Sequence, residues 1–267
     1  TTWLNAQLEC HPGVCMPVVK ELHYFSAVNT PGPRDWATQT VTRAFKREFR
    51  HARQAKNAAT AGLGSTAMVR HLRGLLAMPF FSDDWYRACF DRPDKPGGLC
   101  GEITPAYAEL SDAGIEHVTR LLPDVRIIHL LRHPLDRALS HLRMAAHRRE
   151  VDATEGALMR LLEGNPQILS RGDYQTQVPR WRRHIPPDRL LLLPFGRVRE
   201  APLALLREIE TFIGASPFDG YPLTEQVNTT RRIDIPPGVI QHLETRVQPT
   251  IDFLSAEFGE DFLRATR

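Results

Sequence analysis

The segment Val125–Arg143, which reads VRIIHLLRHPLDRALSHLR, limits what this chain can fold into more than any other. In Ile127–Leu131, β-branched and Leu residues follow one another without polar alternation, which is typical of a strand buried on both faces of a parallel sheet. Pro134 suits the first turn of a helix, where its missing N–H costs nothing. The segment therefore predicts an α/β fold with Arg132 at the carboxyl end of a strand.

The same segment predicts an anion site. Open α/β sheets bind ligands at the carboxyl ends of their strands. Arg132, the start of the helix and the hydroxyl of Ser140 on its second turn together suit a phosphate group. A purely structural interpretation stays open, in which Arg132 caps the helix or pairs with Asp136.

The stretch from Arg132 to Ser140, RHPLDRALS, resembles the 3′-phosphate-binding signature of sulfotransferases, which take a sulfuryl group from 3′-phosphoadenosine 5′-phosphosulfate (PAPS). The resemblance implies that Arg132 and Ser140 hold the 3′-phosphate of that donor. It also implies a three-layer P-loop-like α/β fold, with a central, mainly parallel sheet flanked by helices.

The first residues, Thr1-Thr2-Trp3-Leu4, are similar to the end of the family's phosphosulfate loop and the helix after it. The resemblance implies that the first strand, the loop glycines and the loop lysine precede residue 1. Thr1 and Thr2 would then face the phosphosulfate, and Trp3 would stack on the adenine. The alternative is a plain helix N-cap followed by a core aromatic residue.

The segment KELHYF, at residues 20–25, follows a short apolar stretch in which we expect a strand at Val18 and Val19. It is similar to the K-E-x-H-F-F segment of glycan-type and bacterial sulfotransferases, where the Glu is the proposed base. An acceptor alcohol must lose its proton as it attacks sulfur, so the reaction needs such a group. Glu21 is the first candidate and His23 the second. The alternative is a surface ion pair beside a packed histidine.

Three further segments follow the family's order. Gly101–Tyr107 (GEITPAY) resembles the G-E-K-T-P-x-Y segment, but Ile103 stands where glycan-modifying members often have Lys, which weakens a heparan-sulfate-like assignment. Tyr174 follows an R-G-x-Y start to a helix and is either a donor contact or a buried helix aromatic. Arg231 and Arg232 lie in a late basic loop and either reach the 3′-phosphate or are solvated.

Together these segments predict one sulfotransferase domain over residues 1–267. Residues 26–98 would be its variable, helical acceptor side. The implied reaction is in-line transfer to a hydroxyl or amine, with adenosine 3′,5′-bisphosphate as product and no metal. Two other functions stay open: a P-loop kinase that uses ATP and magnesium, and a domain of the same fold that binds a nucleotide or glycan without turnover.

The region 26–98 is expected to hold helices over Trp36–Ala59, Thr66–Ala77 and Asp83–Phe90, with a flexible link between the first two. The first helix carries many cations and few acids. This basic face fits an acidic acceptor or an anionic lipid surface, or is merely solvated. A last helix is expected over Pro236–Phe262, with a kink or break at Pro249.

Composition limits the setting. The net charge of +3 does not call for nucleic acid, and no apolar run reaches the roughly 18 residues of a membrane span. The cysteines lack zinc-type spacing and are expected to be free thiols, although Cys89 and Cys100 could form a disulfide bond. The N-x-T sequence at Asn228 lies in the expected donor loop and favours a cytoplasmic setting without glycosylation. The high content of Arg, Ala, Leu and Pro favours a bacterial source. An upstream anchor is not excluded, and the acceptor and the oligomeric state are not specified.

Overall fold

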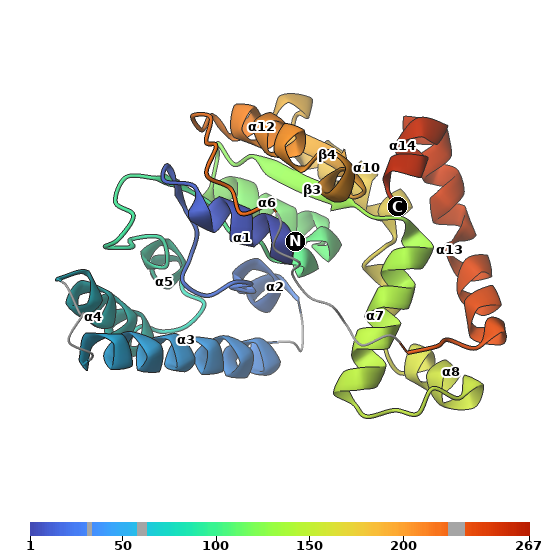
Figure 1. The fold of residues 1–267 in the computed structure, drawn as a ribbon, viewed down its shortest axis with the longest axis horizontal. Coiled ribbons are helices and arrows are strands. Elements are labelled where there is room, and N and C mark those ends of the chain that lie inside the picture. Colours follow the sequence, from blue (N-terminus) through green and yellow to red (C-terminus); the bar gives the residue numbers. More distant parts are fainter. Residues whose placement is uncertain (31–33, 58–62, 224–232) are drawn as a thin grey trace. The chain divides into compact units, whose positions relative to one another are not determined.

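The structure is a computed structural model that describes residues 1–30, 34–57, 63–223 and 233–267 (Figure 1). It divides into two compact units. The first comprises Thr1–Val125 and Arg207–Glu225, and the second comprises Arg126–Leu206 and Gln226–Arg267. Each unit contains one pair of parallel strands among its helices. The α/β class with parallel strands is therefore confirmed.

The first unit is mostly helical. Its elements are α1 (Thr2–Cys10), β1 (Val14–Cys15), α2 (Tyr24–Asn29), α3 (Arg34–Asn57), α4 (Leu63–Ala77), α5 (Asp83–Ala88), β2 (Leu99–Cys100), the 3₁₀ helix η1 (Pro105–Glu109), α6 (Asp112–Leu121) and the part of α12 (Pro202–Ile213) that starts at Arg207. β1 and β2 pair in parallel, with Val14 opposite Leu99 and Cys15 opposite Cys100.

The helical spacing of apolar residues explains how α3 packs. Ala37, Val41 and Phe45 lie on one face of the helix and are buried. α3 runs beside α4 (Figure 1). The ring of Phe45 lies 5.8 Å from that of Trp85 on α5, where the Ser82 hydroxyl caps the helix by accepting the Trp85 N–H. This aromatic core holds α3 and α5 together.

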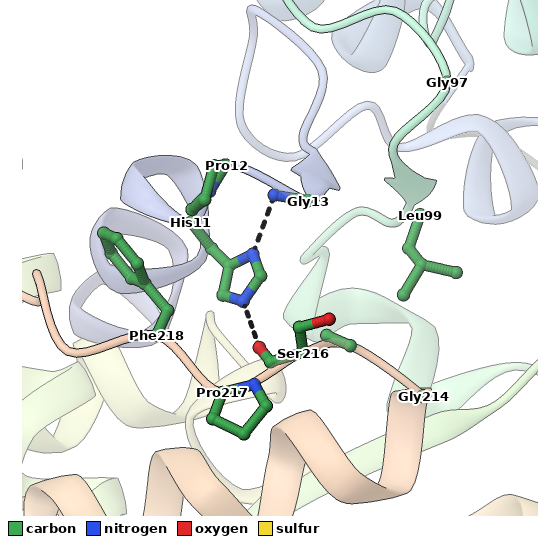
Figure 2. Close-up of a pocket in the computed structure, with 10 residues that line it drawn as sticks. His11, Pro12, Gly13, Gly97, Leu99, Gly214, Ser216, Pro217 and Phe218 are labelled. Atoms are coloured by element: carbon green, nitrogen blue, oxygen red, sulfur yellow. Dashed lines mark hydrogen bonds between the residues drawn. The ribbon is translucent and has the colours of Figure 1, made fainter.

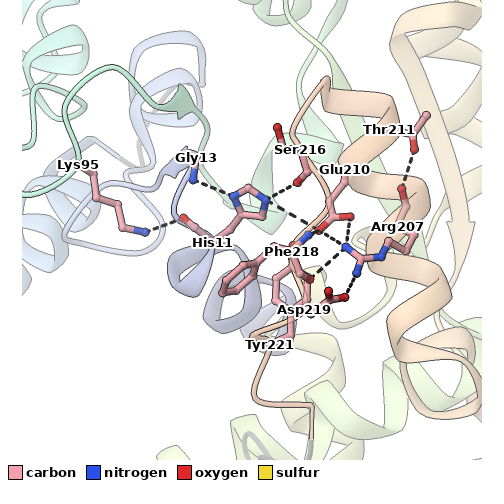
Figure 3. Close-up of polar contacts among 10 residues, drawn as sticks. All are labelled: His11, Gly13, Lys95, Arg207, Glu210, Thr211, Ser216, Phe218, Asp219 and Tyr221. Atoms are coloured by element: carbon pink, nitrogen blue, oxygen red, sulfur yellow. Dashed lines mark hydrogen bonds and ion pairs between the residues drawn. The ribbon is translucent and has the colours of Figure 1, made fainter.

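Hydrogen bonds of the buried His11 join the end of α1 to the segment after α12 (Figure 3). His11 Nδ1 accepts the Gly13 N–H, and its Nε2 donates to the Ser216 carbonyl, each at 2.9 Å. The carboxylate of Glu210 accepts hydrogen bonds from the Tyr221 hydroxyl at 2.8 Å and the Phe218 N–H at 2.9 Å. Both ring nitrogens of His11 are thus used to fix the chain.

The second unit is built on a longer strand pair. Its elements are β3 (Ile127–Leu131), α7 (Pro134–Arg148), α8 (Glu155–Glu163), α9 (Gln167–Ser170), α10 (Tyr174–His184), the 3₁₀ helix η2 (Pro187–Arg189), β4 (Leu190–Pro194), α11 (Arg197–Glu200), the start of α12, α13 (Pro237–Phe258) and α14 (Glu260–Ala265). β3 and β4 are parallel, from Ile127 opposite Leu190 to Leu131 opposite Pro194. The core of this unit lies between α7, α8 and α13, where Leu142, Leu158 and Leu243 are buried.

Several predicted elements are confirmed. The strand at Ile127–Leu131, the helix that begins at Pro134 and the strand from Leu190 all form. The helices expected near Trp36, Thr66 and Asp83 form as α3, α4 and α5. The four cysteines are free thiols.

Three expectations are wrong. The strand expected at Val18 and Val19 lies instead at Val14–Cys15, where β2 supplies a partner. α4 already begins at Leu63, within the expected flexible link, and the rest of that link, 58–62, is outside the described residues. The helix is not broken at Pro249, because α13 continues through it and ends before Gly259, whose φ of +84° favours glycine.

No helix in the described part of the chain is both long enough and apolar enough to span a bilayer.

We predict that the second unit loses stability in mild acid. Burial lowers the pKa of His129, on β3, to about 4. Between pH of about 6.5 and 4 the unfolded chain therefore binds a proton that the folded chain does not. The free energy of unfolding should fall as the pH falls, by up to about 1.4 kcal/mol per pH unit for this proton.

Urea denaturation at several pH values in this window measures the slope. His129→Gln should flatten it, and the same change at the exposed His147 serves as the control. A slope that His129→Gln leaves unchanged contradicts the prediction.

Candidate active site

The backbone of residues 21–23 has an unusual conformation. Glu21 has a φ of +63° and His23 a φ of +55°, both in the left-handed region that non-glycine residues rarely adopt. Leu22, between them, is fully buried, and so is Tyr24, the first residue of α2. The two apolar side chains anchor this turn, and the flanking backbone conformations set the directions of Glu21 and His23.

The candidate base lies between two basic groups. The ammonium of Lys20 contacts Oε1 of Glu21, and Nε2 of His23 lies 3.6 Å from Oε2 of the same carboxylate. The side chain of Glu21 is 35% exposed, whereas that of His23 is 6% exposed. The structure thus brings together the first and the second candidate for the base, with the carboxylate more accessible.

A second carboxylate, that of Glu102, lies near this turn. Glu102 accepts hydrogen bonds from the Thr104 hydroxyl at 2.7 Å and the Tyr107 hydroxyl at 2.9 Å. The hydroxyl of Tyr86 and the backbone N–H of Leu22 also stabilise its charged form, because both act to lower its pKa. Glu102 is therefore held by the start of η1 and interacts with α5 and with the turn that carries the candidate base.

The sequence analysis missed this role. Burial raises the pKa of Glu102, while the hydrogen bonds that it accepts oppose that rise. Burial also raises the pKa of Tyr107 and of Tyr86, and the negative charge of Glu102 raises both further. The Glu in GEITPAY was the available signal, and two of its partners, Thr104 and Tyr107, lie in the same motif. Its interactions with Leu22 and Tyr86 involve two other segments and cannot be read from the motif.

Trp36 lies on the other side of His23. The two rings are 5.0 Å apart and meet edge to face, and Trp36 is 54% exposed. An aromatic surface on α3 therefore lies directly beside the candidate catalytic pair.

The N-terminus of α1 is arranged as a helix start. Thr1 is its N-cap residue and makes no capping hydrogen bond with its side chain. Thr2 and Trp3 are half-buried, and Leu4 is buried. Both interpretations of this segment, a helix cap and an anion site, are compatible with this geometry.

In the second unit, Arg132 follows directly on β3, as expected. Its backbone N–H donates to the Tyr174 hydroxyl at 3.2 Å, and its guanidinium lies 5.2 Å from the ring centre of Phe195, which follows β4. Burial lowers the pKa of Arg132, and the negative charge of Asp136 opposes this. Within the described residues no ion pair joins Arg132 to Asp136 or to any other acid.

A half-buried guanidinium without a carboxylate partner at a strand end is chemically suited to an anionic ligand. Ser140 lies on α7 and is half-buried as well.

Tyr174 is buried, and its ring packs 5.7 Å from that of His129. Its hydroxyl holds the backbone of Arg132, so the structure places it in contact with another candidate. Arg231 and Arg232 lie outside the described residues.

A hollow of about 370 Å³ lies near His11, but it contains none of the predicted site residues (Figure 2). Its lining is formed by loop residues such as Gly13, Gly97 and Pro217, and both nitrogens of His11 are already hydrogen-bonded. The hollow has no charged side chain to hold a phosphate, so we do not assign the site to it.

Within the residues that the structure describes, no group of three or more His, Cys, Asp or Glu side chains could hold a metal ion. The chemistry available in the first unit is proton transfer by a carboxylate held beside an ammonium and an imidazole. The chemistry available in the second unit is anion binding by a guanidinium.

Comparisons with known proteins point to one family. The family model described as "Sulfotransferase family" matches residues 1–219. The bifunctional heparan sulfate N-deacetylase/N-sulfotransferase 3 of Mus musculus is 25% identical over 150 residues, which cover 52% of this chain and 17% of that protein. The bifunctional heparan sulfate N-deacetylase/N-sulfotransferase 2 of Homo sapiens is 28% identical over 153 residues, which cover 53% of this chain and 17% of that protein. The chain thus matches about a sixth of the length of these relatives.

Two solved structures share the fold. A sulfotransferase from Alicyclobacillus acidocaldarius is 20% identical, with a TM-score of 0.67 over 100% of this chain and 94% of that one. The sulfotransferase domain from the curacin biosynthetic pathway is 16% identical, with a TM-score of 0.52 over 92% and 93%. At these identities the likeness establishes the P-loop-like fold alone.

We predict that Glu102→Gln destabilises the first unit. An amide offers one acceptor oxygen in place of two, so the hydroxyl of Thr104 or of Tyr107 loses its partner. We expect a loss of about 1.5–3 kcal/mol in the free energy of unfolding, the range for hydrogen bonds to charged groups. Urea denaturation at neutral pH measures it.

Glu116→Gln, on the exposed face of α6, is the matched control and should change stability by less than about 0.5 kcal/mol. Equal stability of the two variants contradicts the supporting role of Glu102.

Proposed function

Because the chain belongs to the sulfotransferase family, we propose that it moves a sulfuryl group from PAPS to a hydroxyl or amine of an acceptor. The observation that carries this proposal is the half-buried guanidinium of Arg132, which follows β3 and has no acidic partner among the described residues. A nucleotide donor with a 3′-phosphate would supply the missing negative charge.

Arg132 and Ser140 would hold the 3′-phosphate. Tyr174 fixes the main chain of Arg132, which positions the guanidinium. Thr1 and Thr2, at the start of α1, would face the phosphosulfate, and the half-buried Trp3 would stack on the adenine. Arg231 and Arg232 are proposed as further contacts to the 3′-phosphate.

The reaction itself needs one proton transfer. Glu21 would take the proton of the acceptor O–H or N–H as that atom attacks sulfur. The new bond to sulfur forms while the bond from sulfur to the 5′-phosphate oxygen breaks, and adenosine 3′,5′-bisphosphate leaves with the electron pair. Lys20 and His23 hold the carboxylate in place, and His23 is the alternative base. Positioning and charge stabilisation would do most of the catalytic work.

The acceptor class is less specified. The curated relatives are described as acting on heparan sulfate, which makes a glycan one candidate acceptor. Ile103 offers no ammonium at the position where glycan-modifying members often have Lys, so a direct transfer of that specificity is not proposed. We propose that residues 26–98 select the acceptor, that residues 1–267 form one sulfotransferase domain, and that the enzyme works in a bacterial cytoplasm without a metal.

Donor binding is the first test. We predict that the chain, extended upstream by the expected strand and loop, binds adenosine 3′,5′-bisphosphate without metal and in preference to ATP. Arg132→Ala should weaken this binding by about 1.5–3 kcal/mol, because a hydrogen-bonded charge pair is lost. Isothermal titration calorimetry with both nucleotides, with and without magnesium, measures it.

Arg264→Ala, an exposed arginine on α14, is the control. Magnesium-dependent preference for ATP would replace the proposal with a kinase, and unchanged binding by Arg132→Ala would overturn the 3′-phosphate assignment.

Catalysis by Glu21 is tested separately. We predict that Glu21→Gln lowers turnover by roughly 10²–10⁴-fold, because general base catalysis is lost, while the affinity for the bisphosphate is kept. Release of the bisphosphate from PAPS in the presence of an active acceptor measures turnover. Retained activity would transfer the role to His23, which His23→Gln then checks.

A further inference from the structure

One face of α3 presents an uninterrupted line of exposed residues. We call it the α3 stripe, and it consists of Trp36, Gln39, Arg43, Lys46, Arg50 and Arg53. Successive members are three or four positions apart, so they lie above one another along one side of the helix. The buried residues Ala37, Val41 and Phe45 occupy the opposite side. The stripe therefore faces away from the core of the first unit.

The cations of the stripe are not neutralised. Within the described residues, Arg43, Lys46 and Arg50 make no hydrogen bond or ion pair with their side chains. The nearby acid, Glu48, does not belong to the stripe. Its carboxylate pairs instead with Arg47 at 2.8 Å and with His51 at 3.5 Å, which are also outside the stripe. An exposed helix that is merely solvated commonly pairs its charges at this spacing, and this stripe does not.

The surface of the stripe contains a shallow depression. Arg43, Lys46, Phe49 and Arg50 line a shallow hollow of about 320 Å³. The guanidinium of Arg53 lies 5.9 Å from the ring centre of Phe49. An aromatic ring surrounded by cations suits a ligand with both negative groups and apolar C–H faces.

One end of the stripe lies at the candidate base. Trp36 packs 5.0 Å from the ring of His23, which in turn lies 3.6 Å from the Glu21 carboxylate. Arg43 and Arg50 follow Trp36 at intervals of seven residues, which is roughly 10 Å each along a helix. A chain lying on the stripe would therefore have one end at the base and anionic groups over the cations.

The stripe carries four cations, Arg43, Lys46, Arg50 and Arg53, and no acid. A polyanion lying along it would therefore meet positive charge over most of its length.

We propose that the α3 stripe binds a linear polyanion, a chain bearing carboxylate or sulfate groups, and that this chain is the acceptor class of the enzyme. This inference rests on the proposed function. A line of cations along one helix matches a linear chain, whereas a lipid surface would need several exposed apolar side chains to insert, and Trp36 is the strongly exposed one on this stripe.

The test compares two variants of equal charge. One carries Arg43→Gln, Lys46→Gln and Arg50→Gln. The control carries Arg148→Gln, Arg149→Gln and Arg246→Gln, three exposed arginines of the second unit. Binding is measured with a heparin oligosaccharide as the probe, at low and at physiological ionic strength, with neutral dextran as the uncharged comparison.

We expect the stripe variant to bind the heparin probe about tenfold more weakly than the unaltered protein, with a shallower dependence on salt. The control variant should bind it unchanged, and dextran should bind to none of them. Both variants should keep their affinity for adenosine 3′,5′-bisphosphate and their thermal unfolding temperature.

Equal loss of heparin binding in both variants, or no loss in either, overturns the inference while bisphosphate binding leaves the proposed function intact. Loss of bisphosphate binding by the unaltered protein overturns the proposed function itself. Stripe-dependent binding to vesicles containing phosphatidylglycerol, without binding to heparin, overturns the polyanion assignment in favour of a membrane surface.

Discussion

The backbone conformation of residues 21–23 is the constraint on which the candidate site depends. Left-handed φ angles at two non-glycine residues persist only where the surroundings fix the backbone. Burial of Leu22 and Tyr24 fixes the chain on both sides of His23, and the Leu22 N–H stabilises the charge of the half-buried Glu102. The strain in this turn is thus balanced mainly by apolar burial, and the result is a Glu21 carboxylate with a defined direction.

In the second unit, buried residues likewise fix the main chain of Arg132. The buried hydroxyl of Tyr174 accepts the Arg132 N–H, and Phe195 packs against the guanidinium. The parallel register of β3 and β4 places both side chains just beyond the ends of the two strands. In each unit buried residues anchor the main chain of a candidate residue, and the charged group at the end of its side chain stays available. This separation of anchoring from chemistry explains why the supporting residues are less conspicuous in the sequence.

Local patterns predicted the local parts of this structure. The strand at Ile127–Leu131 and the helix at Pro134 follow from apolar runs and proline geometry, which act within a few residues. β1 was misplaced because a two-residue strand is defined by its partner, Leu99–Cys100, far along the chain. Glu102 was missed because Leu22 and Tyr86, which help to stabilise its charge, lie in other segments of the chain. α13 runs through Pro249 because Val247, Thr250 and Leu254 are buried around it, and packing outweighs the cost of one lost hydrogen bond.

The two kinds of cation in this protein suit two kinds of anion. Arg132 is half-buried, so a phosphate bound there is partly removed from water and little screened by salt, which favours tight binding of a small donor. The α3 stripe is exposed, so each contact is weak and sensitive to salt, and affinity comes from several contacts in a line. A polymer held in this way can shift along the helix and leave after transfer. Weak, repeated contacts are therefore a physical advantage for an acceptor that must be released, whereas a single strong contact serves a donor that must be held in one position.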